Sequence, residues 1–286
     1  MGDVQNIQWF PGHMTKTKRK IQENLKLVDA VVEIVDARIP KSSRNPDLNS
    51  IINNKPKILV LNKCDMADPV LTTKWLDYYI SNGTPTITLD CKSGRGISSF
   101  IPKVKNVLSD KINSYKKKGF INKSLKIMVV GIPNVGKSSF INKMSKEKKA
   151  KTEDRPGVTR GNQWFSIGKS IDLLDTPGVL WPKFQDQKVA EKLAFYGSIK
   201  DDILDVEELA ARLIDSLKEN YSNILISRYK IDANTLALDS YEVLNKIALK
   251  RGMIVSKGEP DLRRASLMLL DEFRSAKLGK ITLDTI

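Results

Sequence analysis

The chain has few of the side chains that metal clusters and disulfide frameworks need. It contains one histidine, His13, and two cysteines, Cys64 and Cys91, in 286 residues. A zinc finger or a disulfide-stabilised scaffold requires more of them. No apolar run approaches the roughly 20 residues of a membrane-spanning helix, and the N-terminus has no apolar secretion core. We therefore expect a soluble cytoplasmic protein with reduced thiols and no membrane partner.

Acidic residues are scarce relative to basic ones. The 48 Lys and Arg residues against 33 Asp and Glu residues give a net charge of +15. Residues 1–186 hold 32 basic and 17 acidic residues, whereas residues 187–286 hold 16 of each. This excess indicates an anionic partner and favours nucleic acid. Lysine outnumbers arginine 36 to 12, which suits contact with phosphates without base recognition.

The pattern of apolar residues predicts two domains. Strands that alternate with helical patterns in the first part are typical of an α/β fold with a mostly parallel sheet. From residue 187 onward the pattern is helical, and Asp205 is a predicted helix N-cap. We predict an α/β domain over 1–186 and a smaller all-helical domain over 187–286. The predicted strands are 30–35, 58–61, 86–89, 127–130 and 171–174, and the clearest helices are 70–80, 97–115 and 262–273.

Residues 131–138 read GIPNVGKS and match the phosphate-binding pattern G-x-x-x-x-G-K-[ST]. The run follows a predicted strand and precedes a predicted helix, as the pattern requires. Its glycines let backbone N–H groups surround phosphate oxygens, its lysine places a charge on the β- and γ-phosphates, and its serine is a hard oxygen ligand for Mg²⁺. The candidate phosphate-binding residues are Asn134, Val135, Gly136, Lys137, Ser138 and Ser139.

A second phosphate motif, D-x-x-G, spans residues 175–178 after another predicted strand. Asp175 can hold Mg²⁺ through a water molecule, and the Gly178 N–H can approach the γ-phosphate. Thr159 lies in a polar stretch between the two motifs. It is a candidate second hydroxyl ligand for Mg²⁺, in a loop that only the triphosphate orders.

The base-recognition motif N-K-x-D occurs at residues 62–65, directly after a predicted strand. An Asp carboxylate there accepts hydrogen bonds from guanine N1–H and from the exocyclic amine, a pair of donors that adenine lacks. Residues 90–92 partly match the S-A-K loop, whose backbone N–H binds guanine O6, with Asp and Cys in place of Ser and Ala. The motifs favour GTP and GDP over ATP. The candidate guanine-binding residues are Asn62, Lys63, Cys64, Asp65, Asp90, Cys91 and Lys92.

The order of these motifs is unusual. The base motifs at 62–65 and 90–92 precede the phosphate motifs at 131–138 and 175–178, whereas ordinary GTPases have the phosphate motifs first. This order predicts a circularly permuted P-loop GTPase domain, with the lysine-rich segment 111–126 as the new connection. The permutation also makes the D-x-x-G segment lead directly into the helical domain, so that nucleotide state can be transmitted to residues 187–286.

With these motifs in place, the chain resembles the YlqF/RbgA family of ribosome biogenesis GTPases over nearly its whole length. The resemblance rests on residues 8–14 (QWFPGHM), on residues 36–48 (DARIPKSSRNPDL) and on the permuted motif order. Residues 259–261 and 273–280 also look like the family's C-terminal segment. The resemblance implies binding to the maturing large ribosomal subunit, contact of the helical domain with rRNA, and faster GTP hydrolysis on that particle.

The position after D-x-x-G carries no side chain that can orient the attacking water. Val179 stands where Ras-like enzymes have glutamine, so either intrinsic hydrolysis is slow or another group enters. The resemblance assigns this role to His13, and a neutral imidazole can accept a hydrogen bond or a proton from water near pH 7. The alternative is that His13 only fixes the turn after Pro11 and Gly12, or touches phosphate on rRNA.

Two further features have both a functional and a structural interpretation. Asn134 resembles a K⁺ ligand of related GTPases, although P-loop geometry alone explains an asparagine there equally well. Cys64 and Cys91 occur in the two base-recognition loops, where a redox switch on guanine binding is conceivable. In a reducing compartment, small buried thiols are the simpler interpretation.

Basic clusters at 16–20, 116–118, 143–151 and 246–280 favour RNA binding, with Trp9, Phe10 and Trp164 available for stacking. The leading hypothesis is a monomeric GTPase that binds the large-subunit precursor and its rRNA. One alternative is an RNA-binding assembly scaffold whose GTP site turns over little, which Val179 keeps open. Another is a small signalling GTPase that acts on proteins.

Overall fold

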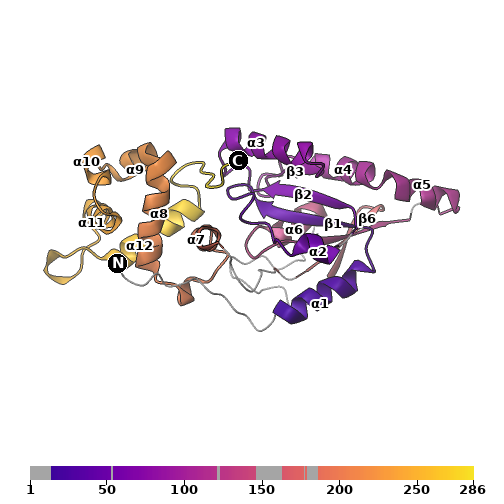
Figure 1. Cartoon of the computed structure of the whole chain (residues 1–286), viewed down its shortest axis with the longest axis horizontal. Helices are drawn as coiled ribbons and strands as arrows, with labels where there is room; N and C mark the ends of the chain where they lie inside the picture. The colour runs from indigo at the N-terminus through magenta and orange to yellow at the C-terminus, as the bar shows by residue number, and fades with distance from the viewer. Residues whose placement is uncertain (1–13, 53, 121–122, 146–162, 177, 179–185) are drawn as a thin grey trace. The chain divides into compact units, whose positions relative to one another are not determined.

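The chain folds into two compact units. Figure 1 shows the computed structural model, which describes residues 14–52, 54–120, 123–145, 163–176, 178 and 186–286. Within the described part, residues 14–178 and Asp284–Ile286 form one unit, here called the α/β unit, and residues 186–283 form the other, the helical unit.

The α/β unit is built on one sheet, which has six strands in the described part of the chain, in the order β3-β2-β1-β4-β6-β5. All neighbouring strands are parallel except β5 and β6, so the prediction of a mostly parallel α/β sheet is confirmed. The antiparallel edge strand β5 is not among the predicted strands. The strands are β1 (Ala30–Asp36), β2 (Lys57–Asn62), β3 (Thr86–Thr88), β4 (Leu125–Val130), β5 (Gln163–Ile167) and β6 (Ile171–Asp175).

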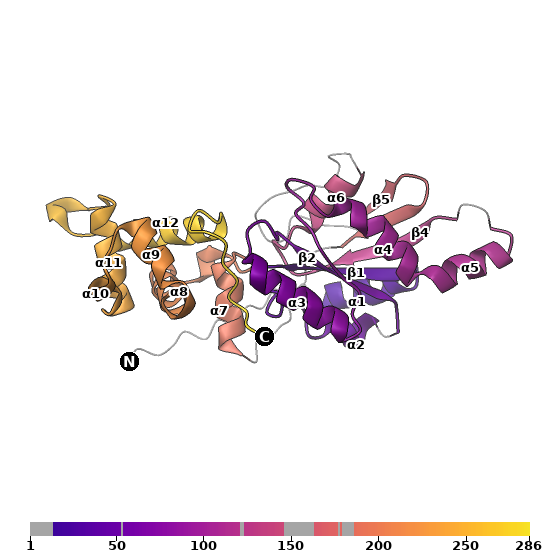
Figure 2. The same cartoon turned by 90° about the horizontal axis from the view of Figure 1, so that it is seen from above.

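Helices cover both faces of this sheet (Figure 2). On one face lie α1 (Met14–Leu25), α2 (Leu48–Ile52) and α3 (Pro69–Ser81), and on the other lie α4 (Phe100–Val107) and α6 (Lys137–Ser145). The rings of Phe100 and Phe140 meet edge to face, with centroids 5.0 Å apart. The single helix predicted over 97–115 is instead three elements: a 3-10 turn (Ile97–Ser99), then α4, then α5 (Ser109–Lys117). The break between α4 and α5 is at Leu108.

The topology brings the motifs to one edge of the sheet. Strands β1, β2, β3, β4 and β6 run parallel, so their carboxyl ends lie at the same edge, and ligands of open α/β sheets bind outside that edge. The P-loop follows β4, the base motifs follow β2 and β3, and the D-x-x-G aspartate ends β6. The base motifs and the phosphate motifs are therefore far apart in the sequence but lie at the same edge of the sheet. This is the arrangement that a circular permutation predicts.

The helical unit contains α7 (Gln187–Phe195), α8 (Val206–Asn220), α9 (Ser222–Tyr229), α10 (Ala233–Leu236), α11 (Ser240–Lys250) and α12 (Leu262–Arg274), with 3-10 turns at Asp201–Ile203 and Ser256–Gly258. Helices α8, α11 and α12 pack against one another through fully buried side chains such as Leu213, Ile247 and Leu269. The predicted N-cap of α8 is present: the Asp205 carboxylate accepts from the N–H groups of Glu207 and Glu208 at 3.0 and 3.1 Å. Among the described helices, none has the length and apolar character needed to cross a membrane.

Candidate functional site

The P-loop links the end of β4 to the start of α6, and its geometry explains its glycines. Gly136 has φ +96°, and a Cβ atom there would collide with the side-chain nitrogen of Asn62. Asn134 has φ +63°, a left-handed conformation that asparagine tolerates better than most residues. The backbone conformation therefore favours asparagine at this position, independently of any bound cation.

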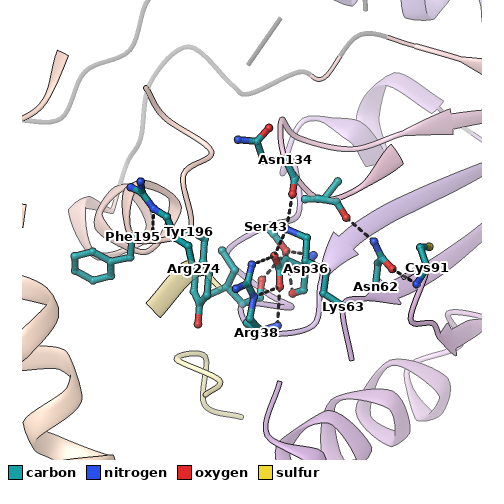
Figure 3. A network of polar contacts seen from close by, with 12 residues as sticks. Asp36, Arg38, Ser43, Asn62, Lys63, Cys91, Asn134, Phe195, Tyr196 and Arg274 are labelled. Carbon is teal, nitrogen blue, oxygen red and sulfur yellow. Dashed lines mark hydrogen bonds and ion pairs between the residues drawn. The ribbon is translucent and has the colours of Figure 1, made fainter. Parts of the chain in front are cut away.

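Asn62 joins the base-recognition loop to the P-loop. Its side-chain nitrogen donates to the carbonyl of Val135 at 2.8 Å, and its oxygen accepts from the Cys91 N–H at 3.4 Å. The side chain is only 2% exposed, so both bonds form in a dry environment, where an unsatisfied polar group is costly. One asparagine thus holds three segments that are far apart in sequence (Figure 3).

A second connection to the P-loop runs through a buried ion pair (Figure 3). Arg38 donates from Nε and Nη2 to the two carboxylate oxygens of Asp36, at 2.9 and 2.7 Å, and both side chains are buried. Lys63 of the base motif lies 3.1 Å from the same carboxylate and donates to the Asn134 carbonyl at 2.5 Å. Burial alone would raise the pKa of Asp36, but Arg38 and Lys63 hold it well below its usual range.

The P-loop lysine and the D-x-x-G motif lie together. Lys137 donates to the Ile132 carbonyl at 2.8 Å, and a Cβ atom at Gly178 would lie 2.9 Å from the Lys137 nitrogen. Asp175 is buried, and one of its carboxylate oxygens has no hydrogen-bond partner among the described residues. Desolvation lowers the pKa of Lys137 to about 8 and raises that of Asp175 to about 6, although each residue's charge opposes the shift of the other. For both groups, the effect of burial on the pKa outweighs the attraction between the two charges.

The loop after β3 departs from the S-A-K pattern in a defined way. The Asp90 carboxylate accepts from the N–H groups of Lys92 and Ser93 at 2.8 and 3.2 Å, so it shapes the turn from within. The Lys92 N–H is occupied by that bond. Among the described residues, the Cys91 N–H bonds only to Asn62, at the long distance of 3.4 Å, and it is the better candidate donor to a base.

The remaining predicted residues fall into three groups. Cys64 and Cys91 are both buried free thiols, and burial raises the pKa of Cys91 to about 12, which supports the interpretation as inert thiols. Asp65, Ser138 and Ser139 are at least partly exposed at the same edge of the sheet, at the loops and helix start where a ligand would approach. The predicted residues His13, Thr159 and Val179 lie outside the described residues.

Sequence reasoning did not identify the pairing of Asp36 with Arg38 and Lys63. Asp36 and Arg38 both belong to the segment DARIP (residues 36–40), which carries part of the family resemblance. An acid and a base two residues apart at the end of a predicted buried strand are a signal of a buried pair. The partner Lys63 comes from a separate motif, so only the fold reveals the complete set.

Comparisons with known proteins agree with this geometry. The family model described as a 50S ribosome-binding GTPase matches residues 126–246. Ribosome biogenesis GTPase A of Priestia megaterium is 44% identical over 97% of this chain and 96% of its own length. Mitochondrial ribosome-associated GTPase 1 of Mus musculus is 35% identical over 97% of this chain and 90% of its own length.

Solved structures resemble the chain over a similar extent. The GDP-bound structure of TM YlqF covers 93% of this chain and 98% of its own, with a TM-score of 0.66 and 27% identity. GNP-bound YlqF from T. maritima covers 94% and 97%, with a TM-score of 0.63 and 28% identity. The permuted motif order, the union of both motif groups at one sheet edge and these full-length matches lead to one conclusion. The chain belongs to the YlqF/RbgA family of ribosome biogenesis GTPases and is a guanine-nucleotide-binding GTPase.

Proposed function

We propose that this GTPase is an assembly factor for the large ribosomal subunit, which binds the rRNA of the precursor particle and hydrolyses GTP faster on it. One observation carries the proposal. Asn62 of the guanine motif is bonded to the P-loop carbonyl of Val135 at 2.8 Å, in a chain 44% identical to a ribosome biogenesis GTPase. The guanine-recognition motif and the phosphate-binding loop are thus directly bonded to each other, as a single GTP site requires.

The residues at the sheet edge have complementary roles toward GTP. Asp65 accepts from guanine N1–H and the exocyclic amine, and the Cys91 N–H donates to guanine O6. The P-loop N–H groups and Lys137 hold the phosphates, and the Gly178 N–H reaches the γ-phosphate. Protonation of Asp175 or deprotonation of Lys137 would weaken these contacts. GTP binding should therefore be strongest between about pH 6 and about pH 8, the pKa values of Asp175 and Lys137.

The donor set at the phosphate end fits Mg²⁺. Hydroxyl and carboxylate oxygens are the ligands this ion prefers, and the unpartnered buried oxygen of Asp175 is placed beside the P-loop lysine. We assign Ser138 and Thr159 as direct ligands and Asp175 as a ligand through water. The ion would neutralise phosphate charge that develops during hydrolysis.

His13 is the proposed group that orients the attacking water, because Val179 cannot do so. The test is a His13→Ala variant, measured for GTP affinity and for turnover with large subunits. We expect affinity within about twofold of wild type and subunit-stimulated turnover reduced by about 10²-fold or more, the usual range for a general base. Stimulated turnover near the wild-type rate would assign His13 to a structural role.

Asn134 is a proposed K⁺ ligand in the nucleotide-bound protein. The left-handed backbone at this residue is an independent reason for asparagine, so the cation needs its own test. GTP hydrolysis is measured in K⁺ and Na⁺ buffers of equal ionic strength. Equal rates in the two buffers would remove the assignment.

Exposed basic residues on both units support contact with rRNA. On the α/β unit, Lys116, Lys117 and Lys118 are exposed at the end of α5. On the helical unit, which we propose as an rRNA-contacting domain over residues 187–286, the exposed basic residues include Lys246, Lys250, Arg251, Lys257, Arg263, Arg264, Lys277 and Lys280. Affinity for rRNA should fall steeply as salt increases, because phosphate contacts release counterions. We propose a monomeric cytoplasmic protein.

The GTPase rate with and without purified large subunits separates this proposal from the alternatives. Strong stimulation supports the assembly GTPase. Binding without stimulation supports an RNA-binding scaffold whose GTP site turns over little. Absence of any interaction with the subunit supports a signalling GTPase that acts on proteins.

A further inference from the structure

The last residues of the chain lie with the α/β unit, although residues 186–283 belong to the helical unit. The Asp284 carboxylate accepts from the N–H groups of Lys41 and Ser42 at 2.8 and 2.7 Å, and from the Ser42 hydroxyl at 2.7 Å. Its backbone carbonyl accepts from the Trp75 indole at 3.1 Å. Asp284 is 2% exposed. These four bonds make Asp284 an anchor in the loop that follows β1.

That loop leads back to the ion pair beneath the P-loop. The Ser43 hydroxyl donates to the Ile39 carbonyl at 2.6 Å and accepts from the Asp36 N–H at 3.0 Å. The Tyr79 hydroxyl donates to the Pro40 carbonyl at 3.1 Å. Residues 36–43 therefore form one hydrogen-bonded turn, with Asp284 at one end and the Asp36 carboxylate at the other.

From Asp36 the contacts continue into the nucleotide site. Lys63 bridges the Asp36 carboxylate and the Asn134 carbonyl, at 3.1 and 2.5 Å (Figure 3). Lys63 belongs to N-K-x-D, and Asn134 belongs to the P-loop. A series of hydrogen bonds and one ion pair, linked by the backbone of residues 36–43 and all within the α/β unit, thus joins the C-terminal anchor to both halves of the site.

The residues just before Asp284 are anchored in the helical unit. The Tyr221 hydroxyl donates to the Thr282 carbonyl at 3.0 Å and accepts from its N–H at 3.1 Å. Only Leu283 separates Thr282 from Asp284. Two Cα–Cα steps of about 3.8 Å reach at most about 7 Å. The segment from Thr282 to Asp284 can therefore lengthen very little. Any larger displacement of the helical unit must break either the Thr282 bonds to Tyr221 or the Asp284 bonds to residues 41 and 42.

We propose that Asp284 is a positioning residue for the guanine-nucleotide site. Docked in the turn over residues 36–43, it holds Asp36 and Lys63, and through them the P-loop, in the arrangement that binds nucleotide. Release of the segment 281–284, here called the C-terminal strap, lowers guanine-nucleotide affinity. The strap thereby ties nucleotide affinity to the state of the helical unit.

The first test measures GDP affinity with a fluorescent N-methylanthraniloyl GDP. The full-length Asp284→Ala variant should bind GDP about 5- to 20-fold more weakly, within the usual range of coupling between linked sites. Asp284→Asn, which keeps an acceptor oxygen, should lose less. The matched control is Ile286→Ala, because Ile286 is 62% exposed at the end of the chain; it should bind GDP as the wild type does. Binding by Asp284→Ala within twofold of wild type overturns the proposal.

A double-mutant cycle separates positioning from a general loss of stability. In a Lys63→Ala background the series of contacts is already cut, so Asp284→Ala should have no further effect on GDP affinity. An undiminished effect in that background would mean that Asp284 acts only on the stability of the unit, and would overturn the proposal. The cycle uses no ribosomal particle, so its outcome is independent of the proposed assembly function.

A measurement on the wild-type protein covers the case in which Asp284→Ala does not fold. By linkage, GDP must tighten the strap by the same factor by which the strap tightens GDP. Amide hydrogen exchange at Lys41 and Ser42 should therefore slow about 5- to 20-fold when GDP binds. The control amide is Gly83, which bonds to the Ile80 carbonyl at 2.9 Å in a turn outside this series. Exchange at Lys41 and Ser42 that slows no more than at Gly83 overturns the proposal.

Discussion

Replacing Arg38 with methionine should lower the free energy of unfolding of the α/β unit by about 3–5 kcal/mol, the usual cost of removing one partner of a buried ion pair. Arg38 and Asp36 are 2% and 3% exposed and share two hydrogen bonds of 2.9 and 2.7 Å. Without Arg38, the buried carboxylate keeps Lys63 at 3.1 Å, but that side chain is 24% exposed and already donates to the P-loop. Much of the Asp36 charge is then left uncompensated.

The double variant Asp36→Asn/Arg38→Met removes the charge together with its partner, so most of the lost stability should return. Arg19→Met is the matched control. Its ion pair with Glu23 is 3.2 Å long, but the two side chains are 82% and 63% exposed, so its removal should change stability by about 0.5 kcal/mol or less. Because the pKa of Asp36 is held below its usual range, the stability from this pair exists above pH about 4 and is lost as the pH falls further.

Tryptophan fluorescence in urea can follow this unit selectively. The four tryptophans, Trp9, Trp75, Trp164 and Trp181, all belong to residues 1–186 in the sequence, and residues 187–286 contain none. With an m-value of about 2.5 kcal/mol per M, a loss of 3–5 kcal/mol lowers the urea midpoint by roughly 1–2 M. A change below about 1 kcal/mol in Arg38→Met, or a double variant as unstable as the single one, would refute the argument.

Three other outcomes are expected. Gly136→Ala should weaken GDP binding by about 10- to 100-fold, because its Cβ atom meets Asn62; Gly83→Ala, with φ +73° and open space around it, should leave binding unchanged. Mg²⁺-dependent GTP affinity should fall about tenfold from pH 7 to pH 5, because the Asp175 pKa is about 6 and the protonated carboxyl is a poor Mg²⁺ ligand. A GTP affinity that does not change with pH over this range would contradict this. Asp205→Ala should cost the helical unit about 1 kcal/mol, seen as a lower midpoint by circular dichroism with unchanged tryptophan fluorescence.

The sheet and the grouping of the motifs could be predicted because their signals are local. Strands β1, β2, β4 and β6 are nearly continuous apolar runs, as buried parallel strands require. Strand β5 was not predicted because it lies at the edge of the sheet. Its residues Gln163, Trp164 and Ser166 are exposed, so five residues offer too few apolar positions to distinguish a strand from a loop.

The contacts that connect the site could not be predicted, because they join residues distant in sequence. Asp284 contacts Ser42 across 242 positions, and nothing in the local sequence of the tail marks it as buried. The bonds that Asp90 makes could not be predicted from the motif either. It stands where S-A-K has serine, and its carboxylate accepts from the Lys92 N–H at 2.8 Å.

The chain enters the helical unit after the D-x-x-G motif, because α7 follows Asp175 and Gly178 in the sequence. The base half is reached at its other end, where Asp284 enters the turn that supports Lys63. With the Gly178 N–H at the γ-phosphate, as proposed above, a change in the D-x-x-G motif should alter GTP affinity more than GDP affinity. Release of the C-terminal strap should alter the positions of Lys63 and Asn134. Both GTP and GDP bind the loops that contain these residues, so both affinities should change by the same factor. The ratio of the two changes, measured in Asp284→Ala, thus identifies the route: a factor equal for both nucleotides assigns it to the strap, and a factor larger for GTP assigns it to the phosphate half.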